Sequence, residues 1–231
     1  MTIETNVAKG SGRIMSLSDL SIRVVLADDH KMVREALARI LEDSGKINIV
    51  AQASDGTEAL AAVRETQPEV IVLDYSMPGQ DASTVIEKLL RSSPDIKILV
   101  LTIHENIHYA VRVLEAGAHG YLIKSAAVDE LVEAIGTVHQ GRIYVSPQVS
   151  QEVLRHLRQP KRERVGLDSL SQREFDLLRM FGAGKTLQES ARQMKISTST
   201  ASTYRARIME KLNLASTAEL IRFALEHNVV G

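Results

Sequence analysis

Between Ile22 and Gly141, short apolar segments alternate with longer segments whose apolar residues recur at helical spacing. The short segments are rich in Val, Ile and Leu, which is typical of strands buried on both faces of a parallel sheet. We expect five such strands, at 22–27, 47–53, 70–74, 97–102 and 120–124. Helical crossovers of one hand would then cover both faces of the sheet. The alternation therefore predicts a flavodoxin-like, doubly wound α/β fold with a five-stranded parallel sheet.

After Tyr144 the alternation stops and the remaining segments are helical in pattern. Ser171 with Glu174, and Thr186 with Glu189, have the spacing of capping boxes, which open helices. The predicted helices cover 171–181, 186–194, 198–212 and 217–226. Because only a short turn separates the second helix from the third, the segment 186–212 predicts a helix-turn-helix within an all-α, four-helix domain.

We expect four regions in the chain: a disordered leader (1–21), an α/β domain (22–143), a linker that contains a helix (144–166) and a helical domain (167–231). The leader lacks the apolar core of a signal peptide, and no apolar run approaches the roughly 20 residues of a membrane span. The chain has no Cys, which excludes disulfides and cysteine catalysis and fits a cytoplasmic setting. These features predict a protein that does not contact the membrane.

The charges are unevenly distributed, although the net charge is only −1. From Pro160 onward there are twelve Lys/Arg and eight Asp/Glu, and the part before it is acidic. A basic C-terminal domain is a candidate for binding a polyanion.

Acidic residues follow two of the predicted strands, with Asp28 and Asp29 after the first and Asp74 after the third. The carboxyl ends of parallel strands meet at one edge of the sheet, where ligands of open α/β folds bind. Three carboxylates repel one another unless a cation lies among them, and oxygen ligands favour Mg²⁺. Thr102 and Lys124 end two further strands and could bind phosphoryl oxygens. Asp74 is thus a candidate phosphoryl acceptor, although such a residue taken alone is more often a strand-ending Asp that caps the following turn.

Nucleotide binding is not expected. The first strand is followed by two carboxylates, whereas a dinucleotide site needs a Gly-rich loop there. The segment 182–186 resembles the end of a phosphate-binding loop, but Arg179 occupies the position of its first Gly and a helix precedes it. His104 and His108 have helical spacing but lack an acidic third ligand for zinc.

Taken together, these positions resemble the receiver domain of two-component response regulators. The resemblance covers about 22–141 and rests on Asp28-Asp29, Asp74 with Met77-Pro78, Thr102, and Gly120 to Lys124. It implies that Asp74 accepts phosphate from a sensor histidine kinase or a phosphotransfer protein. It further implies that Asp29, Asp74 and the backbone carbonyl of Ser76 bind Mg²⁺ directly, with Asp28 acting through water.

The same resemblance assigns the other residues around the acceptor. Thr102 and Lys124 would hold the phosphoryl oxygens, and Tyr121 would be the aromatic switch that rotates as Thr102 moves. Ser76 and His104 occupy positions that tend to tune dephosphorylation in the family. The chain departs from the family at Ala82, where the family usually has Gly, and this departure bears on the geometry of the loop.

The third predicted helix of the helical domain places small hydroxyl residues before arginines, which suits a recognition helix in the major groove. An ordinary amphipathic helix with a solvated face would carry a similar pattern. Leu170-Ser171, Arg173-Glu174, Gly184 to Thr186, Thr200, Tyr204 and Lys211 to Asn213 resemble the LuxR-type DNA-binding domain of the NarL/FixJ class. That resemblance implies DNA contacts by Lys185, Thr200, Ser202, Thr203, Tyr204, Arg205, Ala206 and Arg207.

The leading hypothesis is a phosphorylation-controlled transcription regulator, not an enzyme, that binds double-stranded promoter DNA as a homodimer when active. By resemblance, the dimer would form through the helix 217–226. One alternative is an aspartyl-phosphate phosphatase, but that chemistry needs a second Asp where Ser76 stands. Another is an interaction module that never binds DNA. The sequence does not identify the kinase, the signal or the promoters.

Overall fold

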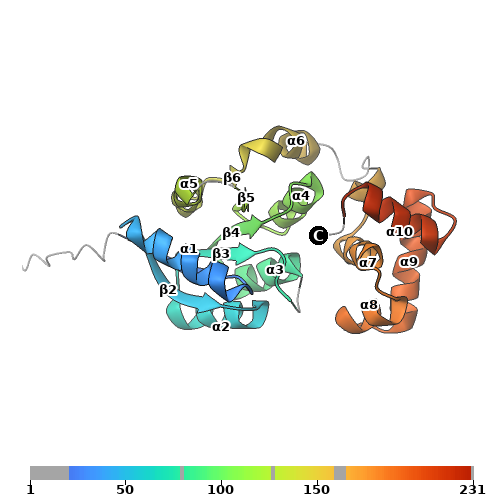
Figure 1. The fold of residues 1–231 in the computed structure, drawn as a ribbon, viewed down its shortest axis with the longest axis horizontal. Coiled ribbons are helices and arrows are strands. Elements are labelled where there is room, and N and C mark those ends of the chain that lie inside the picture. The colour runs from blue at the N-terminus through green and yellow to red at the C-terminus, as the bar shows by residue number, and fades with distance from the viewer. Residues whose placement is uncertain (1–20, 79–80, 126–127, 159–164, 230–231) are drawn as a thin grey trace, which may run out of the picture.

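The computed structural model describes residues 21–78, 81–125, 128–158 and 165–229. The expected N-terminal leader lies outside these residues, except for Ser21. Within them, an α/β domain and a helical domain are separated along the chain by helix α6 (Pro147–Leu157), as Figure 1 shows. No helix of the described part of the chain is long and apolar enough to cross a membrane.

The α/β domain contains one parallel sheet with the strand order β2-β1-β3-β4-β5-β6. Its strands are β1 (Ile22–Ala27), β2 (Ile47–Ala53), β3 (Val70–Asp74), β4 (Lys97–Thr102), β5 (Gly120–Ile123) and β6 (Tyr144–Val145). The five expected strands and the doubly wound order are confirmed. The sixth strand falls in the segment assigned to the linker, because two residues are too few to show an alternating pattern.

Helices cover both faces of the sheet (Figure 1). They are α1 (Lys31–Asp43), α2 (Gly56–Thr66), α3 (Ala82–Ser92), α4 (Ile107–Glu115) and α5 (Val128–His139). In β3, Val70 and Val72 face the core beneath α1 and α5, whereas Ile71 and Leu73 face the core beneath α2, α3 and α4. Both sets are fully buried, which explains why the strand has no polar residue before Asp74.

Ala82, the residue that departs from the family pattern, is the first residue of α3. Its backbone is helical and does not adopt a positive φ, so no glycine is required for conformational reasons. Asp81 precedes it as the N-cap and accepts a hydrogen bond from the backbone N–H of Thr84 at 2.9 Å. A helix cap therefore fixes the position at which α3 begins.

The helical domain consists of the 3₁₀ helix η3 (Gly166–Ser169) and helices α7 (Gln172–Gly182), α8 (Leu187–Gln193), α9 (Thr198–Leu212) and α10 (Thr217–Glu226). Both expected capping boxes are present, at the starts of α7 and α8. Lys195 and Asn213 adopt the left-handed conformation, at φ 55° and 52°, where the chain turns after α8 and after α9. The helix-turn-helix is thus confirmed as α8, a short turn and α9.

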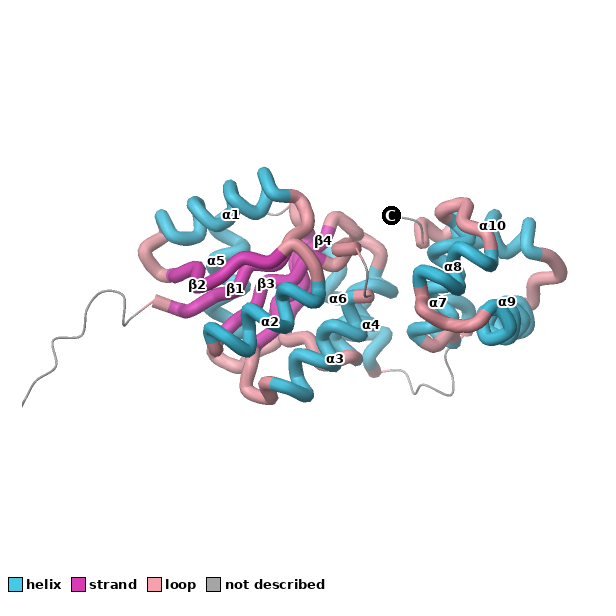
Figure 2. Tube along the Cα trace, turned by 90° about the horizontal axis from the view of Figure 1, so that it is seen from below, coloured by secondary structure: helices cyan, strands magenta, loops and turns pink. Residues whose placement is uncertain are grey.

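The two domains contact each other through α4 of the α/β domain and α7 of the helical domain. In both Figure 1 and Figure 2, α7 lies on the side of the helical domain that faces the α/β domain, and α9 lies on the far side. This arrangement decides which surfaces of the helical domain remain exposed.

Candidate functional site

The acidic edge of the sheet forms because β1 and β3 are neighbours in register. Ala27 pairs with Leu73, so Asp28 and Asp74 follow at the same edge. Both are buried, at 1% and 2% exposure. Lys124 comes from the end of β5 and its Nζ lies 2.8 Å from Asp28 Oδ2 and 3.0 Å from Asp74 Oδ2. The structure therefore brings together three of the predicted site residues in one ion-pair network.

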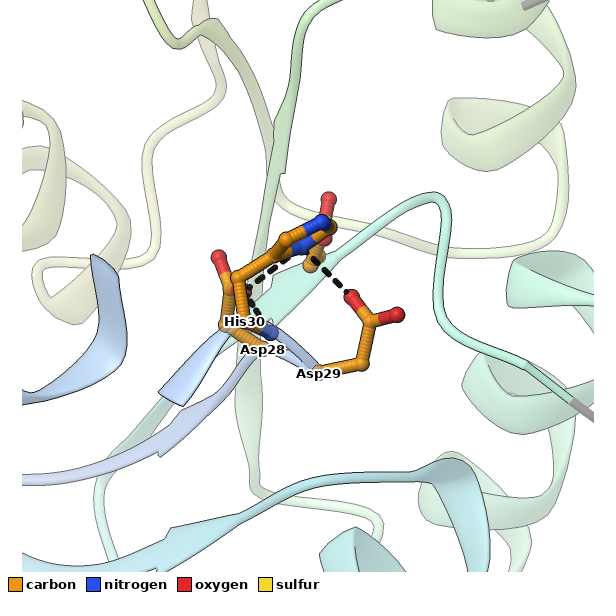
Figure 3. A group of neighbouring side chains, drawn as sticks. Asp28, Asp29 and His30 are labelled. Carbon is orange, nitrogen blue, oxygen red and sulfur yellow. Dashed lines mark hydrogen bonds and ion pairs between the residues drawn. The ribbon is translucent and has the colours of Figure 1, made fainter. Parts of the chain in front are cut away.

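Asp29 and His30 extend this cluster toward solvent. His30 Nδ1 lies 2.9 Å from Asp29 Oδ1 and 3.5 Å from Asp28 Oδ1, and Figure 3 shows the imidazole turned toward both carboxylates. One side-chain donor atom from each of Asp28, Asp29, His30 and Asp74 lies within 4.8 Å of the others. The residues thus form a compact donor set that could bind a metal ion. Sequence reasoning missed His30, although it directly follows the acidic pair.

The electrostatics of the cluster depend on Lys124. Burial raises the pKa of the Asp74 carboxyl, and the Lys124 ammonium opposes this shift. Burial alone would lower the pKa of Lys124, but its contacts with Asp28 and Asp74 outweigh burial and raise it. Lys124 is therefore a firmly protonated counter-ion, which favours the ionised and nucleophilic form of Asp74.

Thr102 and Tyr121 lie beside the acidic cluster on β4 and β5. Thr102 is fully buried, and its hydroxyl accepts a hydrogen bond from the backbone N–H of His104 at 3.1 Å. The Tyr121 hydroxyl donates to the carbonyl of His104 at 2.7 Å, and burial raises the pKa of Tyr121. Both predicted residues therefore contact the segment that follows β4, which links the edge of the sheet to the start of α4.

Ser76 and His104 approach each other above this edge, with Ser76 Oγ 3.4 Å from His104 Nε2. The backbone N–H of Ser76 donates to Asp74 Oδ1 at 3.3 Å. Burial lowers the pKa of His104, so its imidazole is neutral at physiological pH. The two residues thus form one polar contact beside the Asp74 carboxylate.

The second candidate site is the outer surface of α9. Ala201 and Ile208 are fully buried and fix the inward face of the helix. Thr203, Ala206 and Arg207 are exposed, whereas the remaining predicted DNA-binding residues are partly buried: Lys185, Thr200, Ser202, Tyr204 and Arg205. Thr200 is also held locally, because its hydroxyl lies 2.7 Å from that of Ser197. The exposed face of α9 carries hydroxyl, methyl and guanidinium groups, which are suited to a major groove.

Comparisons with known proteins agree with this two-site organisation. Residues 24–136 match the response regulator receiver domain, and residues 168–224 match the bacterial regulatory proteins of the luxR family. The response regulator GacA of Pseudomonas aeruginosa is 38% identical over 209 residues, which are 90% of this chain and 98% of that protein. The response regulator UvrY of Escherichia coli (strain K12) is 36% identical over 208 residues, 90% of this chain and 95% of that protein.

Solved structures of similar arrangement include RcsB of Salmonella typhimurium. One RcsB structure, described in terms of conformational dynamism for DNA interaction, covers 90% of this chain and 98% of its own, at 25% identity and a TM-score of 0.72. RcsB bound to the rprA promoter in the presence of the phosphomimetic BeF₃⁻ covers 88% of this chain and 98% of its own, at 27% identity and a TM-score of 0.68.

Proposed function

Because this chain belongs to the NarL/FixJ class of response regulators, which are phosphorylation-dependent transcription regulators and not enzymes, we propose that Asp74 is its phosphoryl acceptor. The donor is the phosphohistidine of a sensor histidine kinase or of a phosphotransfer protein. A carboxylate oxygen of Asp74 forms a bond to phosphorus while the phosphorus–nitrogen bond of the donor breaks, and the imidazole leaves. The observation that carries the proposal is the buried position of Asp74 at the carboxyl end of β3, with Lys124 Nζ at 3.0 Å.

Mg²⁺ fits the oxygen ligands proposed for this site, since the three carboxylates and the backbone carbonyl of Ser76 are hard ligands. Asp29, Asp74 and the carbonyl of Ser76 would hold it directly, and Asp28 would act through a water. When bound, the ion neutralises charge on the phosphoryl oxygens and the carboxylates. The close approach of the Asp28, Asp29 and Asp74 oxygens, all within 4.8 Å, supports this assignment.

We assign to Thr102 and Lys124 the role of binding the phosphoryl oxygens. The Lys124 ammonium already lies at hydrogen-bonding distance from Asp74, and a phosphoryl group on Asp74 would offer it stronger acceptors. The Thr102 hydroxyl would turn from the N–H of His104 to the phosphoryl group. Tyr121, which holds the carbonyl of His104, would then change position with that segment.

On the helical domain, we assign base contacts to Ser202, Thr203 and Ala206. Lys185, Thr200, Tyr204, Arg205 and Arg207 are assigned to the DNA backbone or flanking bases. The exposure of Thr203, Ala206 and Arg207 on one face of α9 supports this division. The active form is a homodimer through α10, on which Ala218 and Leu225 are exposed while Leu220 and Ala224 pack into the domain core. A two-fold symmetric dimer would read two half-sites.

The experiment compares DNA binding with and without acetyl phosphate and Mg²⁺ for the unmodified chain, for Asp74→Ala and for Asp95→Ala. Asp95 is an exposed acid outside the cluster and serves as the control. We expect acid-labile phosphorylation and tighter DNA binding for the unmodified chain and for Asp95→Ala, but not for Asp74→Ala. Phosphorylation of Asp74→Ala at the normal level would refute the assignment of the acceptor.

The phosphatase alternative is disfavoured by the same site. Its second acid would stand where the chain has Ser76, whose backbone N–H and hydroxyl contact Asp74 and His104. A neutral serine hydroxyl is a poor general acid compared with a carboxylic acid.

A further inference from the structure

Helix α4 carries most of the described polar contacts between the two domains. Asn106, its N-cap, donates through Nδ2 to the carbonyl of His227 at 2.9 Å. Arg112 donates to the carbonyls of Leu167 and Leu170 at 3.0 and 3.1 Å, and its guanidinium lies 4.0 Å from the ring centre of Phe175. One helix of the α/β domain therefore donates hydrogen bonds to backbone carbonyls near both the start and the end of the helical domain.

Tyr109 makes the most deeply buried of these contacts. Its side chain is fully buried, and its hydroxyl donates to the carbonyl of Val229, three residues past the end of α10, at 2.6 Å. Burial raises the pKa of Tyr109 to about 12, so the hydroxyl keeps its proton at physiological pH. Its ring also packs edge-on against Phe175 of α7, with the ring centres 5.4 Å apart. Tyr109 thus binds the helical domain at two separate elements.

The other side of the Tyr109 ring contacts residues next to the acceptor site. It stacks on His104, with centres 4.3 Å apart and an interplanar angle of 10°. It also packs edge-on against Tyr75 at 4.8 Å. Tyr75 directly follows Asp74. The backbone of His104 is hydrogen-bonded to the side-chain hydroxyls of both Thr102 and Tyr121. A movement of Thr102 or Tyr121 would therefore displace a ring against which Tyr109 is packed.

The recognition surface itself is not covered by these contacts. Thr203, Ala206 and Arg207 are exposed while the Tyr109 hydroxyl is hydrogen-bonded to the carbonyl of Val229. The α/β domain therefore restrains the segment that follows α10 and leaves the exposed face of α9 open. Control by such a contact would act on the position of α10, and hence on pairing of two chains on DNA, rather than on access to the bases.

We propose that Tyr109 is the positioning residue that couples the acceptor site to the helical domain, because its ring rests on His104 and Tyr75 while its hydroxyl restrains Val229. This inference rests on the proposed function of Asp74 as acceptor. Displacement of His104 on phosphorylation moves the Tyr109 ring and breaks the hydrogen bond from the Tyr109 hydroxyl to the carbonyl of Val229. Helix α10 is then free to pair with a second copy of the chain.

The test is Tyr109→Phe, which keeps the ring and removes only the hydroxyl. Tyr144→Phe is the matched control, since the Tyr144 hydroxyl donates to Glu130 within the α/β domain at 3.0 Å. For the unphosphorylated Tyr109→Phe chain we expect DNA affinity to rise roughly fivefold, the factor that corresponds to one net hydrogen bond. The phosphorylated affinity should not change, so the difference between the two states should shrink. Tyr144→Phe should behave as the unmodified chain.

A purely structural role for Tyr109 would alter both states alike, so an equal change in the two affinities would overturn the proposal. No change in the unphosphorylated affinity would overturn it too, while leaving phosphorylation control intact. Failure of the proposed function is distinguishable, because the unmodified chain would then show no effect of phosphorylation. Amide hydrogen exchange of the unmodified chain gives an independent measurement. Residues 227–229 should exchange faster after phosphorylation, and unchanged protection would contradict the coupling.

Discussion

At the scale of single residues, the chemistry that we propose for the acidic cluster comes with a cost in stability. Asp28 and Asp74 are almost fully buried, and Lys124 is the cation that both of them contact. Burial raises the pKa of Asp74, which means that ionising its carboxyl costs more in the folded state than in the unfolded chain, despite the opposing effect of Lys124. A side chain placed for phosphoryl transfer is thus expected to lower the stability of the domain that holds it.

Asp74→Asn should therefore stabilise the protein in the absence of divalent cations. Because the pKa of Asp74 is raised in the folded state, its carboxyl destabilises the fold increasingly as the pH rises above the ordinary value of 3.8. An amide does not ionise, so we expect the free energy of unfolding at pH 7 to increase by about 1 kcal/mol. Urea denaturation measures the change.

The gain should diminish as the pH falls toward the ordinary value of 3.8 and vanish well below it, where the unmodified carboxyl is protonated in both states. Asp95→Asn, the same exchange at an exposed acid, should leave the unfolding free energy within about 0.5 kcal/mol of the original. A loss of stability in Asp74→Asn would show that the ion pair with Lys124 outweighs the burial of charge.

At the scale of elements, α9 divides its residues between packing and exposure. Ala201 and Ile208 fix the helix against the domain core, and Lys211 joins it to α7 through Glu174 Oε2 at 2.7 Å. Although burial would raise the pKa of Glu174, the Lys211 and Ser171 contacts lower it. The orientation of α9 is thus set by both apolar packing and a partly buried ion pair, which leaves Thr203 and Arg207 on its outer face.

Substitutions on this outer face should separate affinity from specificity. Arg207→Ala removes a cation that we assign to a DNA phosphate, so it should weaken binding about equally for all DNA sequences. It should also reduce by about 1 the salt slope, which is the slope of the logarithm of the binding constant against the logarithm of the salt concentration. Thr203→Ala removes a group assigned to a base edge, so it should change the preferred sequence at a cost of roughly 1–3 kcal/mol. Binding titrations at several salt concentrations, on matched and altered sites, measure both effects.

Arg39→Ala provides the control for charge, because Arg39 is exposed on α1 of the other domain. It should leave the salt slope as it is. If Arg207→Ala also left the slope unaltered, α9 would not approach phosphate through that residue.

At the scale of the whole molecule, the contact between domains buries a carboxyl. Asp176 on α7 is 2% exposed; its Oδ1 accepts from Gln172 at 2.9 Å, and its Oδ2 has no hydrogen-bond partner among the described residues. Burial and the nearby Asp81 of the other domain raise the pKa of Asp176 to about 7, although Arg179 and Arg112 oppose the shift. The closed arrangement is therefore expected to respond to pH.

We expect the domains to separate more readily as the pH rises from 6 to 8. An open arrangement would expose Asp176 and return its pKa toward 3.8, so the closed form binds more protons between that value and about 7. The equilibrium constant for domain closure therefore falls as the pH rises, by at most about tenfold between pH 6 and 8. Small-angle X-ray scattering of the unphosphorylated chain measures the separation.

Asp176→Asn should remove this dependence, because the amide stays neutral. A pH response of equal size in Asp176→Asn would show that Asp176 does not cause the pH dependence of domain separation. Asp95→Asn again provides the control for an exposed acid.

The sequence by itself determined the two domains' classes, the capping boxes and the acidic edge. Strand burial, helix caps and strand-end carboxylates are local patterns, and the parallel order brings Asp28, Asp74 and Lys124 together in any fold of this kind. Only the tertiary structure decided that Tyr109 contacts both His104, next to the acidic cluster, and Val229, 120 residues away in the chain. An aromatic residue on an apolar helix face predicts burial but not the surface that buries it, because packing partners are chosen by the whole arrangement.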